Sequence, residues 1–353
     1  MNPLDRRTLF KAGAVGSGGL LLGGASGMLS PAAAAPEVGR TLARGLVIPW
    51  GVAFFKGGDA LVSERGSADI YRVSRRGGKR RVGRVDNVRD NAGEGGLLGL
   101  AIAPNFCDNR RVYAYISTPS DNRVVRMTNV AGRLYDQKLV LGGIPTDDIH
   151  NGGRLAFGPD GLLYVSTGDA GDSSSSQSTS SLGGKILRMT PGGEAPAGNP
   201  FNNLVWSFGH RNVQGLAFHR GDLWATELGQ STRDELNQIV KGHNYGWPDV
   251  EGGDGRGDFH DPFVTWSPTS RCSPSGLAIA HGKAFVGALA GQALMRVDLA
   301  GPDKGKKRRL FHETFGRIRT VQKAPDGSLW ITTSNRDRDG AGPDDDRVIR
   351  IRV

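Results

Sequence analysis

The sequence predicts an all-β fold, a six-bladed β-propeller, and three observations support this prediction. A pattern of short apolar strands and tight turns recurs six times. Gly and Pro, 54 and 18 of the 353 residues, are too frequent for a helical bundle. No segment that resembles a linker interrupts residues 40–353, so a stack of separate sandwiches is the weaker alternative.

The first 35 residues are predicted to be a twin-arginine signal peptide. Arg6 and Arg7 precede a weakly apolar segment that leads to the small residues 32–34. Seven glycines within this segment make an amphipathic helix a poor alternative. We therefore expect residues 36–353 to form one propeller domain that is exported by the twin-arginine route. Its destination would be the extracellular space, the periplasm or the cell envelope.

Each copy of the repeat contains a short apolar strand, a turn with Gly or Pro-Asp-Gly, and a second strand. The first strands are expected at 51–54, 99–102, 154–157, 215–218, 276–279 and 319–322. The second strands are expected at 60–62, 112–116, 163–165, 223–225, 284–286 and 329–331. A strand pair cannot bury both of its faces alone, whereas six sheets arranged radially cover one another. Small Gly and Ala residues on the innermost strands would let the blades converge on the axis.

The formal net charge of +10 fits nucleic acid, an anionic surface or a small anionic ligand as a partner. Basic clusters at 75–81 and 304–309 contain no interleaved aromatic residues and no nucleic-acid module, so we expect solvated loops and no nucleic-acid partner. After the leader, no run of about 18 uncharged apolar residues occurs, which excludes a membrane-spanning protein. Cys107 and Cys272 either form one disulfide bridge or remain free thiols.

The functional site of a propeller is expected at one mouth of the central channel, on the loops that enter the inner strands. Four of five such loops carry ionisable groups other than a lone carboxylate. The loops are 91–96, 150–153, 209–214, 271–275 and 317–318. Clustering at equivalent positions of the repeat indicates a shared site.

The sequences of these loops resemble those of the glucose/sorbosone dehydrogenase family. Its members are soluble quinoproteins that use pyrroloquinoline quinone (PQQ) and calcium. The matching segments follow the family order at 94–101, 150–155, 168–171, 209–217, 234–239 and 242–248. The fold of this family is the six-bladed propeller, in agreement with the repeats. The resemblance implies a secreted enzyme that oxidises the anomeric carbon of an aldose to the lactone. The hydride would pass to PQQ, and the electrons to an external acceptor.

Oxidation of the anomeric carbon removes a hydroxyl proton and a hydride, and a neutral imidazole is a suitable base near neutral pH. The resemblance implies that His150 is this base. It also implies that Arg211 and Asn212 contact the quinone, with Arg211 polarising the reacting carbonyl region. Arg317 and Arg319 match two arginines that hold quinone carboxylates.

The resemblance further implies two calcium ions. The backbone carbonyl groups of Gly229 and Gln230 would hold the first ion, which would act as a Lewis acid on the quinone. Glu235 and Tyr245 would hold a second, structural ion. For Tyr245, a purely packing role is an open alternative.

Several residues depart from the family pattern. Glu94 occupies the position of a glutamine in the cofactor site, and Ile149 that of an aspartate beside the base. Ala290 replaces a lysine that would grip the quinone, and Ser334 replaces an acidic residue. Arg271 or another nearby base could compensate for the missing lysine.

These departures leave three functions open. The first is oxidation of a broad range of aldoses or of another alcohol. The second is a non-catalytic, calcium-stabilised propeller that binds carbohydrate or protein. The third is a calcium-dependent lactone hydrolase. The sequence is compatible with a monomer or a homodimer.

Overall fold

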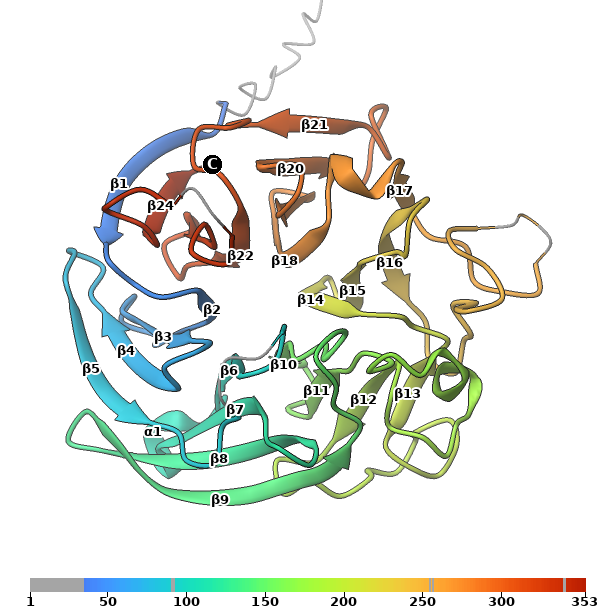
Figure 1. The fold of residues 1–353 in the computed structure, drawn as a ribbon, viewed down its shortest axis with the longest axis horizontal. Helices are drawn as coiled ribbons and strands as arrows, with labels where there is room; N and C mark the ends of the chain where they lie inside the picture. The colour runs from blue at the N-terminus through green and yellow to red at the C-terminus, as the bar shows by residue number, and fades with distance from the viewer. Residues whose placement is uncertain (1–34, 90–92, 254, 256, 339–340) are drawn as a thin grey trace, which may run out of the picture. The chain divides into compact units, whose positions relative to one another are not determined.

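The computed structural model describes residues 35–353 except 90–92, 254, 256 and 339–340. The compact unit Ala35–Val353 contains six four-stranded antiparallel sheets, arranged as the blades of a ring around a central channel (Figure 1). The predicted six-bladed β-propeller is confirmed. Residues 1–34 of the predicted signal peptide lie outside the described residues, so that assignment stays a prediction.

The strands of the six blades are named here from the channel outward. The innermost strands are β2 (Pro49–Phe54), β6 (Leu97–Ile102), β10 (Leu155–Phe157), β14 (Val213–His219), β18 (Pro274–Ala280) and β22 (Ile318–Lys323). The second strands are β3 (Ala60–Glu64), β7 (Arg111–Ser117), β11 (Leu163–Ser166), β15 (Asp222–Glu227), β19 (Lys283–Ala288) and β23 (Leu329–Thr333). The third strands are β4 (Asp69–Val73), β8 (Asn122–Val130), β12 (Lys185–Met189), β16 (Asp234–Ile239), β20 (Ala293–Asp298) and β24 (Val348–Arg352). The outermost strands are β5 (Lys79–Arg84), β9 (Arg133–Ile144), β13 (Val205–Phe208), β17 (Val264–Trp266), β21 (Lys307–Leu310) and β1 (Glu37–Ala43).

The sixth blade closes the ring with a strand from the other end of the domain. Strand β1 pairs antiparallel with β24, with Glu37 opposite Arg352 and Val38 opposite Ile351. The blade therefore has the order β1-β24-β23-β22, in which only the outer strand comes from the N-terminal side. This pairing ties the first and last described strands together and covers the edge of β24.

The hydrophobic core lies between the blades. Six clusters of buried apolar side chains occur in the described residues, and each joins neighbouring blades. Between the first and sixth blades, the rings of Phe54 and Trp330 meet edge to face at 4.8 Å. Between the second and third blades, the rings of Tyr113 and Phe157 also meet edge to face, with their centroids 5.4 Å apart. Each blade is therefore stabilised mainly by its neighbours, as expected for radial packing.

Glycines on the inner strands allow the blades to converge on the central axis, as the sequence predicts. A Cβ on Gly51 would lie 2.7 Å from the carbonyl oxygen of Leu98, and one on Gly276 would lie 2.6 Å from the Cα of Thr320. A Cβ on Gly99 or Gly215, at the equivalent positions, would come closer still to a neighbouring carbonyl oxygen, that of Gly153 just before β10 or that of Ser275 on β18. These four blades therefore have no room for a side chain where neighbouring inner strands meet.

The third blade carries an arginine at the position equivalent to these glycines, and the sixth carries a threonine. The guanidinium of Arg154 donates to the carbonyl oxygen of Gln214 at 2.8 Å and to Oγ1 of Thr320 at 3.2 Å. It also lies 4.1 Å from the centre of the Trp50 ring. Burial, together with the nearby Arg319 cation, lowers the pKa of Arg154 to about 9. Arg154 thus links the inner strands of four blades across the channel.

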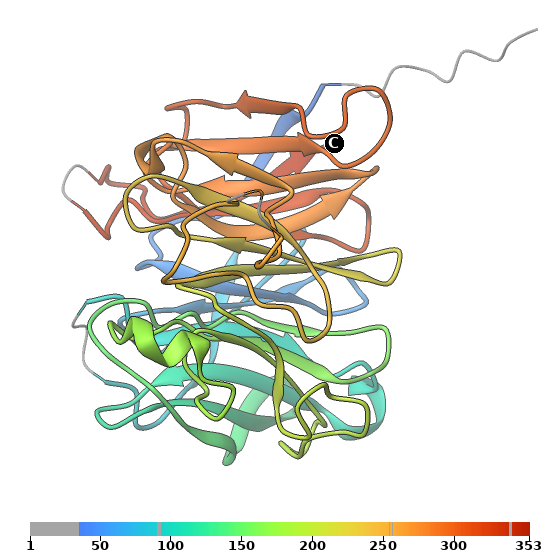
Figure 2. The same ribbon diagram turned by 90° about the vertical axis from the view of Figure 1, so that its right-hand side faces the viewer.

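The remaining helical segments are short: α1 (Phe106–Asn109), η1 (Ser173–Gln177) and η2 (Thr269–Arg271). No helix in the described part of the chain has the length and apolar character needed to cross a membrane. Cys107 is exposed on α1, whereas Cys272 is buried behind η2, and both are free thiols. The sequence left a disulfide bridge or two free thiols open, and the structure shows the free thiols. Figure 2 shows the connecting loops gathered at the two ends of the channel.

Replacing Gly99 with alanine tests the packing of the inner strands. We expect Gly99→Ala to lower the free energy of unfolding by about 1–3 kcal/mol, because the added methyl group would overlap the backbone of Gly153. Urea unfolding measures the change. Gly57→Ala is the matched control, since a Cβ at Gly57 would meet no atom within 4 Å. Equal unfolding midpoints for the two variants would contradict the packing argument.

Candidate active site at the channel mouth

Loops from several blades bring His150, Arg211 and Asn212 to the same mouth of the channel. Oε2 of Glu94 accepts a hydrogen bond from the backbone N–H of His150 at 3.1 Å and one from Nδ2 of Asn212 at 3.4 Å. The backbone N–H of Asp169 donates to the carbonyl oxygen of Arg211 at 2.8 Å. The structure therefore brings these predicted residues of the second, third and fourth blades together.

His150 forms a hydrogen-bonded pair with a carboxylate that the sequence analysis did not select. Nδ1 of His150 lies 2.7 Å from Oδ1 of Asp169, whose side chain is only 2% exposed. Oδ2 of Asp169 accepts from Nε1 of Trp247 at 2.8 Å. Burial opposes ionisation, but the hydrogen bonds from His150 and Trp247 hold the pKa of Asp169 below its ordinary value. An ionised Asp169 places the imidazole proton on Nδ1, which leaves Nε2 of His150 free as a base.

Backbone conformation directs His150 into the mouth. Its φ of 54° is in the left-handed region, which non-glycine residues rarely adopt. The neighbouring Gly168 packs directly on the His150 carbonyl group and leaves no room for a side chain. Strain of this kind concentrates at functional sites, where the surrounding structure maintains it.

Arg211 is held beside this pair by three groups. Its Nη1 donates to the carbonyl oxygen of Leu228 at 3.2 Å, and its guanidinium lies 5.4 Å from the centre of the Trp247 ring. Its backbone N–H donates to the carboxylate of Glu227. Nε of Arg211 is buried and has no hydrogen-bond partner in the described part of the chain, so the side chain retains an unused donor. Asn212 is 1% exposed, and its Oδ1 accepts from the backbone N–H of Gly152 at 3.1 Å.

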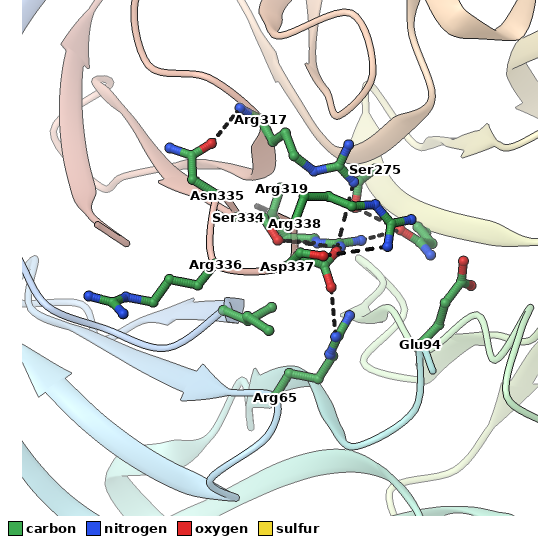
Figure 3. Close-up of polar contacts among 12 residues, drawn as sticks. Arg65, Glu94, Ser275, Arg317, Arg319, Ser334, Asn335, Arg336, Asp337 and Arg338 are labelled. Carbon is green, nitrogen blue, oxygen red and sulfur yellow. Dashed lines mark hydrogen bonds and ion pairs between the residues drawn. The ribbon is translucent and has the colours of Figure 1, made fainter. Parts of the chain in front are cut away.

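Three arginines meet one carboxylate on the side of the mouth formed by the first and sixth blades (Figure 3). Oδ1 of Asp337 lies 2.7 Å from Nη2 of Arg65, and Oδ2 lies 2.8 Å from Nη2 of Arg319. Nη2 of Arg317 is 3.8 Å from Asp337. Burial opposes ionisation of Asp337, but the neighbouring cations Arg319 and Arg65 keep its pKa low. We call these four residues the arginine fork.

The arginine fork contains more positive than negative charge. One carboxylate serves three guanidinium groups, and the buried Nε atoms of Arg65 and Arg317 have no hydrogen-bond partner among the described residues. Buried cations and donors without partners are costly, and carboxylate or phosphate oxygens satisfy them well. A planar guest with several carboxylates therefore fits the residues present at this mouth.

Glu94 gives the mouth an acidic residue opposite the arginine fork. Figure 3 shows Glu94 beside the arginine fork, on the side away from Arg336. It accepts hydrogen bonds from groups of His150 and Asn212, as described above. Glu94 thus contacts the predicted base and the predicted quinone contact, and it can accept further hydrogen bonds from a bound hydroxyl group.

Three of the four predicted calcium ligands lie together. Gly229, Glu235 and Tyr245 line a small cavity next to Arg211, and Glu227 and Glu251 complete its acidic wall. The predicted fourth ligand, Gln230, is exposed and lies outside this lining.

The contacts of these candidate ligands bear on their predicted roles. Burial and the nearby Glu227 carboxylate raise the pKa of Glu235 to about 8. The hydroxyl of Tyr245 donates to the Gln238 carbonyl oxygen at 2.8 Å, which favours packing for this side chain. In the described part of the chain, no three His, Cys, Asp or Glu side chains are grouped to hold a metal ion. The calcium ligands therefore stay a prediction.

Four residues of the site were missed from the sequence: Arg65, Asp169, Trp247 and Asp337. Three of them follow second strands, whereas the sequence analysis considered the loops that enter first strands. In an antiparallel pair, the end of the second strand lies beside the start of the first, so both loops reach one mouth. An acidic residue was expected at position 334, which is a serine. Asp337 lies three residues beyond it. Trp247 lay in a matched segment but had no assigned role.

Comparison with known proteins identifies the family. The profile of the Glucose / Sorbosone dehydrogenase family matches residues 46–341, and the chain belongs to this family. Its fold is similar to the PQQ-bound form of aldose sugar dehydrogenase from Streptomyces coelicolor, with a TM-score of 0.86 and 47% identity over 90% of this chain and 97% of that one.

Two curated relatives show how far the similarity extends. The chain is 28% identical to aldose sugar dehydrogenase YliI of Escherichia coli, over 81% of this chain and 86% of that protein. It is 34% identical to quinoprotein glucose dehydrogenase B of Acinetobacter calcoaceticus, over 54% of this chain and 48% of that protein. The similarity to the Acinetobacter protein thus covers only about half of either chain.

Removing the carboxylate of the arginine fork tests its contribution to stability. We expect Asp337→Asn to lower the free energy of unfolding by about 3 kcal/mol at neutral pH, because two buried guanidinium groups lose their counter-ion. Since the folded-state pKa of Asp337 is lowered, this stabilisation is present above the unfolded-state pKa. It is lost as the pH falls through the lowered folded-state pKa, so variant and wild type should converge at acidic pH, below the ordinary pKa of an aspartate.

The control is Asp344→Asn, which breaks the exposed pair with Arg44 and should cost less than about 1 kcal/mol. Thermal or urea unfolding across this pH range provides the measurement. Equal losses in both variants at pH 7 would contradict a special role for the arginine fork.

Proposed function

We propose that this protein is a PQQ-dependent aldose dehydrogenase that oxidises the anomeric carbon of a sugar to the lactone. The observation that carries this proposal is the arrangement of the mouth, where the His150–Asp169 pair lies across from the arginine fork. A base positioned opposite an anion-binding cluster fits a sugar on one side and an anionic quinone on the other. The family membership and the PQQ-bound relative support the same activity.

His150 has the geometry of a general base for this reaction. Asp169 fixes the tautomer and stabilises the imidazolium that forms when Nε2 accepts the hydroxyl proton of the sugar. Trp247 holds the second oxygen of Asp169 and so limits rotation of the carboxylate. PQQ, when bound, would accept the hydride and pass its electrons on to an external acceptor.

The remaining residues of the mouth would bind and orient. The guanidinium of Arg211 and the amide of Asn212 would donate to quinone oxygens, and Arg317 and Arg319 would hold quinone carboxylates. Glu94 would accept hydrogen bonds from sugar hydroxyl groups. Because three arginines share one aspartate, the mouth attracts the anionic cofactor before any direct contact forms.

Calcium is a further part of the proposal. The backbone carbonyls of Gly229 and Gln230 would hold an ion beside the quinone, where it would act as a Lewis acid. Glu235 and Tyr245 would hold a second ion. The support is electrostatic: burial and the Glu227 carboxylate raise the pKa of Glu235, and a cation in this cavity would relieve that repulsion.

We also infer that residues 1–35 direct export by the twin-arginine route, so that the enzyme would work outside the cytoplasm with an external electron acceptor. The paired Arg6 and Arg7 and the small residues 32–34 support this assignment. The alternative of a non-catalytic, carbohydrate-binding propeller rests on Glu94 and Ala290. It leaves the His150–Asp169 pair without a role.

Reconstitution tests the activity directly. Purified apoprotein is mixed with PQQ and calcium, and reduction of a dye acceptor is followed for a panel of aldoses. We expect turnover and a change in quinone absorbance. Absence of both across the panel would falsify the dehydrogenase proposal and favour the binding propeller.

His150→Ala identifies the base within the reconstituted enzyme. We expect kcat to fall by about 10²- to 10⁴-fold, because no other group replaces the imidazole, while PQQ binding stays nearly unchanged. His219→Ala is the control, since His219 ends β14 and lines the cavity at the opposite end of the channel. Loss of PQQ binding in His150→Ala would show that the residue holds the cofactor instead.

The calcium proposal predicts a pH-dependent stabilisation of the apoprotein. Because the pKa of Glu235 is raised, its contribution to stability is present at low pH and is lost as the pH rises toward about 8. Calcium should therefore raise the Tm more at pH 9 than at pH 5, since the ion competes with the proton. Glu235→Gln should abolish this difference, whereas the exposed Glu313→Gln should not. If the calcium-induced rise in Tm depended on pH equally in Glu235→Gln and Glu313→Gln, the assignment of Glu235 as a ligand would be contradicted.

A further inference from the structure

Lys185, the first residue of β12, is a buried cation for which the proposed reaction has no use. Its side chain is enclosed, and Nζ donates to the backbone carbonyl oxygens of Ser175 at 2.8 Å, Ser176 at 3.0 Å and Gly183. Among the described residues no carboxylate pairs with this ammonium group, and burial lowers the pKa of Lys185 to about 7. Burial of a cation without a counter-ion is costly. The three carbonyl contacts thus hold the side chain in place, and they bind it to a single loop.

The three carbonyl groups belong to the two ends of one loop, residues 173–183. Ser175 and Ser176 lie in η1, whereas Gly183 lies two residues before Lys185. The ammonium group therefore closes this loop onto the start of β12. Of the five residues of η1, only Ser176 is buried, and none is apolar. The segment has little hydrophobic packing of its own, so its position depends on its hydrogen bonds.

Ser176 connects the loop to the fourth blade. Its Oγ donates to the carbonyl oxygen of His210 at 2.7 Å, and its own carbonyl oxygen accepts from the backbone N–H of Gly209 at 2.9 Å. That carbonyl oxygen is also one of the acceptors of the Lys185 ammonium group. Gly209 and His210 directly precede Arg211, the predicted quinone contact. The bonds of Lys185 thus extend from the third blade to the backbone that carries Arg211.

Gln177, the last residue of η1, continues the connection to the segment that contains Trp247. Its Nε2 donates to the carbonyl oxygen of Trp247 at 2.7 Å and to Oδ1 of Asn244 at 3.1 Å. Nδ2 of Asn244 donates to Oε1 of Gln177 at 2.7 Å, so the two amide groups are paired. The backbone N–H of Trp247 donates to the carbonyl oxygen of Gly209 at 2.9 Å. The backbone of Trp247 is therefore held through its N–H by Gly209 and through its carbonyl group by Gln177.

Trp247 transmits this position to the predicted base. Its Nε1 donates to Oδ2 of Asp169 at 2.8 Å, and Oδ1 of Asp169 lies 2.7 Å from Nδ1 of His150. A hydrogen bond weakens steeply when its donor shifts or tilts, so a displaced indole would let the Asp169 carboxylate rotate. Rotation would lengthen the bond to His150 and mix the two tautomers of the imidazole. A continuous series of contacts thus runs from Lys185 to His150.

We propose that Lys185 and Gln177 are positioning residues for the predicted base. By holding η1, they hold Trp247 against Asp169 and so keep Nε2 of His150 free to accept a proton. The effect on turnover rests on the proposed function. The effect on the His150–Asp169 pair depends only on the contacts described above.

Lys185→Met and Gln177→Leu test the proposal, because both variants nearly keep the size of the side chain and remove its hydrogen bonds. We expect kcat for an aldose to fall about tenfold in each variant, since the imidazole spends less time in the productive tautomer. KM should change less than about twofold, because both residues act through Trp247. Ser174→Ala is the matched control and should leave kcat unchanged. Ser174 lies in the same segment, and its Oγ donates to Oδ1 of the exposed Asp172 at 2.6 Å.

A second measurement does not require turnover. In the full-chain apoprotein at alkaline pH, ¹⁵N NMR of labelled histidine reports which nitrogen of His150 carries the proton, and His150→Ala assigns the signal. We expect Nδ1–H in the wild type and in Ser174→Ala, and a mixture of both tautomers in Lys185→Met and Gln177→Leu. A loss of global stability alone would not change the tautomer in the folded protein. If Lys185→Met does not fold, Gln177→Leu decides the question, since Gln177 is only partly buried.

The two measurements separate the positioning role from the proposed function. An unchanged tautomer in both variants would overturn the positioning role, whether or not the wild type oxidises an aldose. An active wild type whose kcat neither variant lowers would also overturn it and leave the proposed function intact. A wild type that oxidises no aldose, together with a changed tautomer in the variants, would contradict the proposed function alone.

Discussion

The close approach of the inner strands at the channel is the constraint on which the rest of this structure depends. At Gly51, Gly99, Gly215 and Gly276, one inner strand packs directly on the next, and any side chain would push the blades apart. The ring is therefore narrow enough for loops of different blades to bond across its mouth. Glu94 reaches His150, and Arg65 reaches Asp337, because the strands below them converge.

The mouth that results has two electrically different sides. A buried carboxylate next to His150 keeps one nitrogen of the imidazole available as a proton acceptor. The facing side concentrates guanidinium groups around Asp337, which holds them in place without neutralising them. A base and an anion-binding cluster disturb each other if they are mixed, because each shifts the pKa of the other. The arginine fork lies on other blades than His150, whereas Arg211 stands beside the His150–Asp169 pair.

Two apparent losses in the sequence are explained by neighbouring residues. Ser334 stands where an acidic residue was expected, but Asp337 brings a carboxylate to the mouth, and Oγ of Ser334 lies 3.4 Å from Nη2 of Arg319. Ala290 stands where a lysine was expected, and the cavity beside it is lined by Arg338 and not by Arg271. Positive charge at this mouth therefore comes from another loop. Comparing sequences position by position does not detect such replacements.

The sequence by itself determined the six strand repeats, their turns and the positions of His150, Arg211 and Arg317, because alternating polarity and turn residues act over a few neighbouring positions. It did not reveal the outermost strands or the closure of the ring by β1 and β24. It also did not identify Asp169, Arg65 or Asp337 as partners. Arg65 and Asp337 are 272 positions apart in the chain, and only the closed ring brings them to 2.7 Å. Contacts of that kind depend on how all six blades pack, which no local pattern of residues specifies.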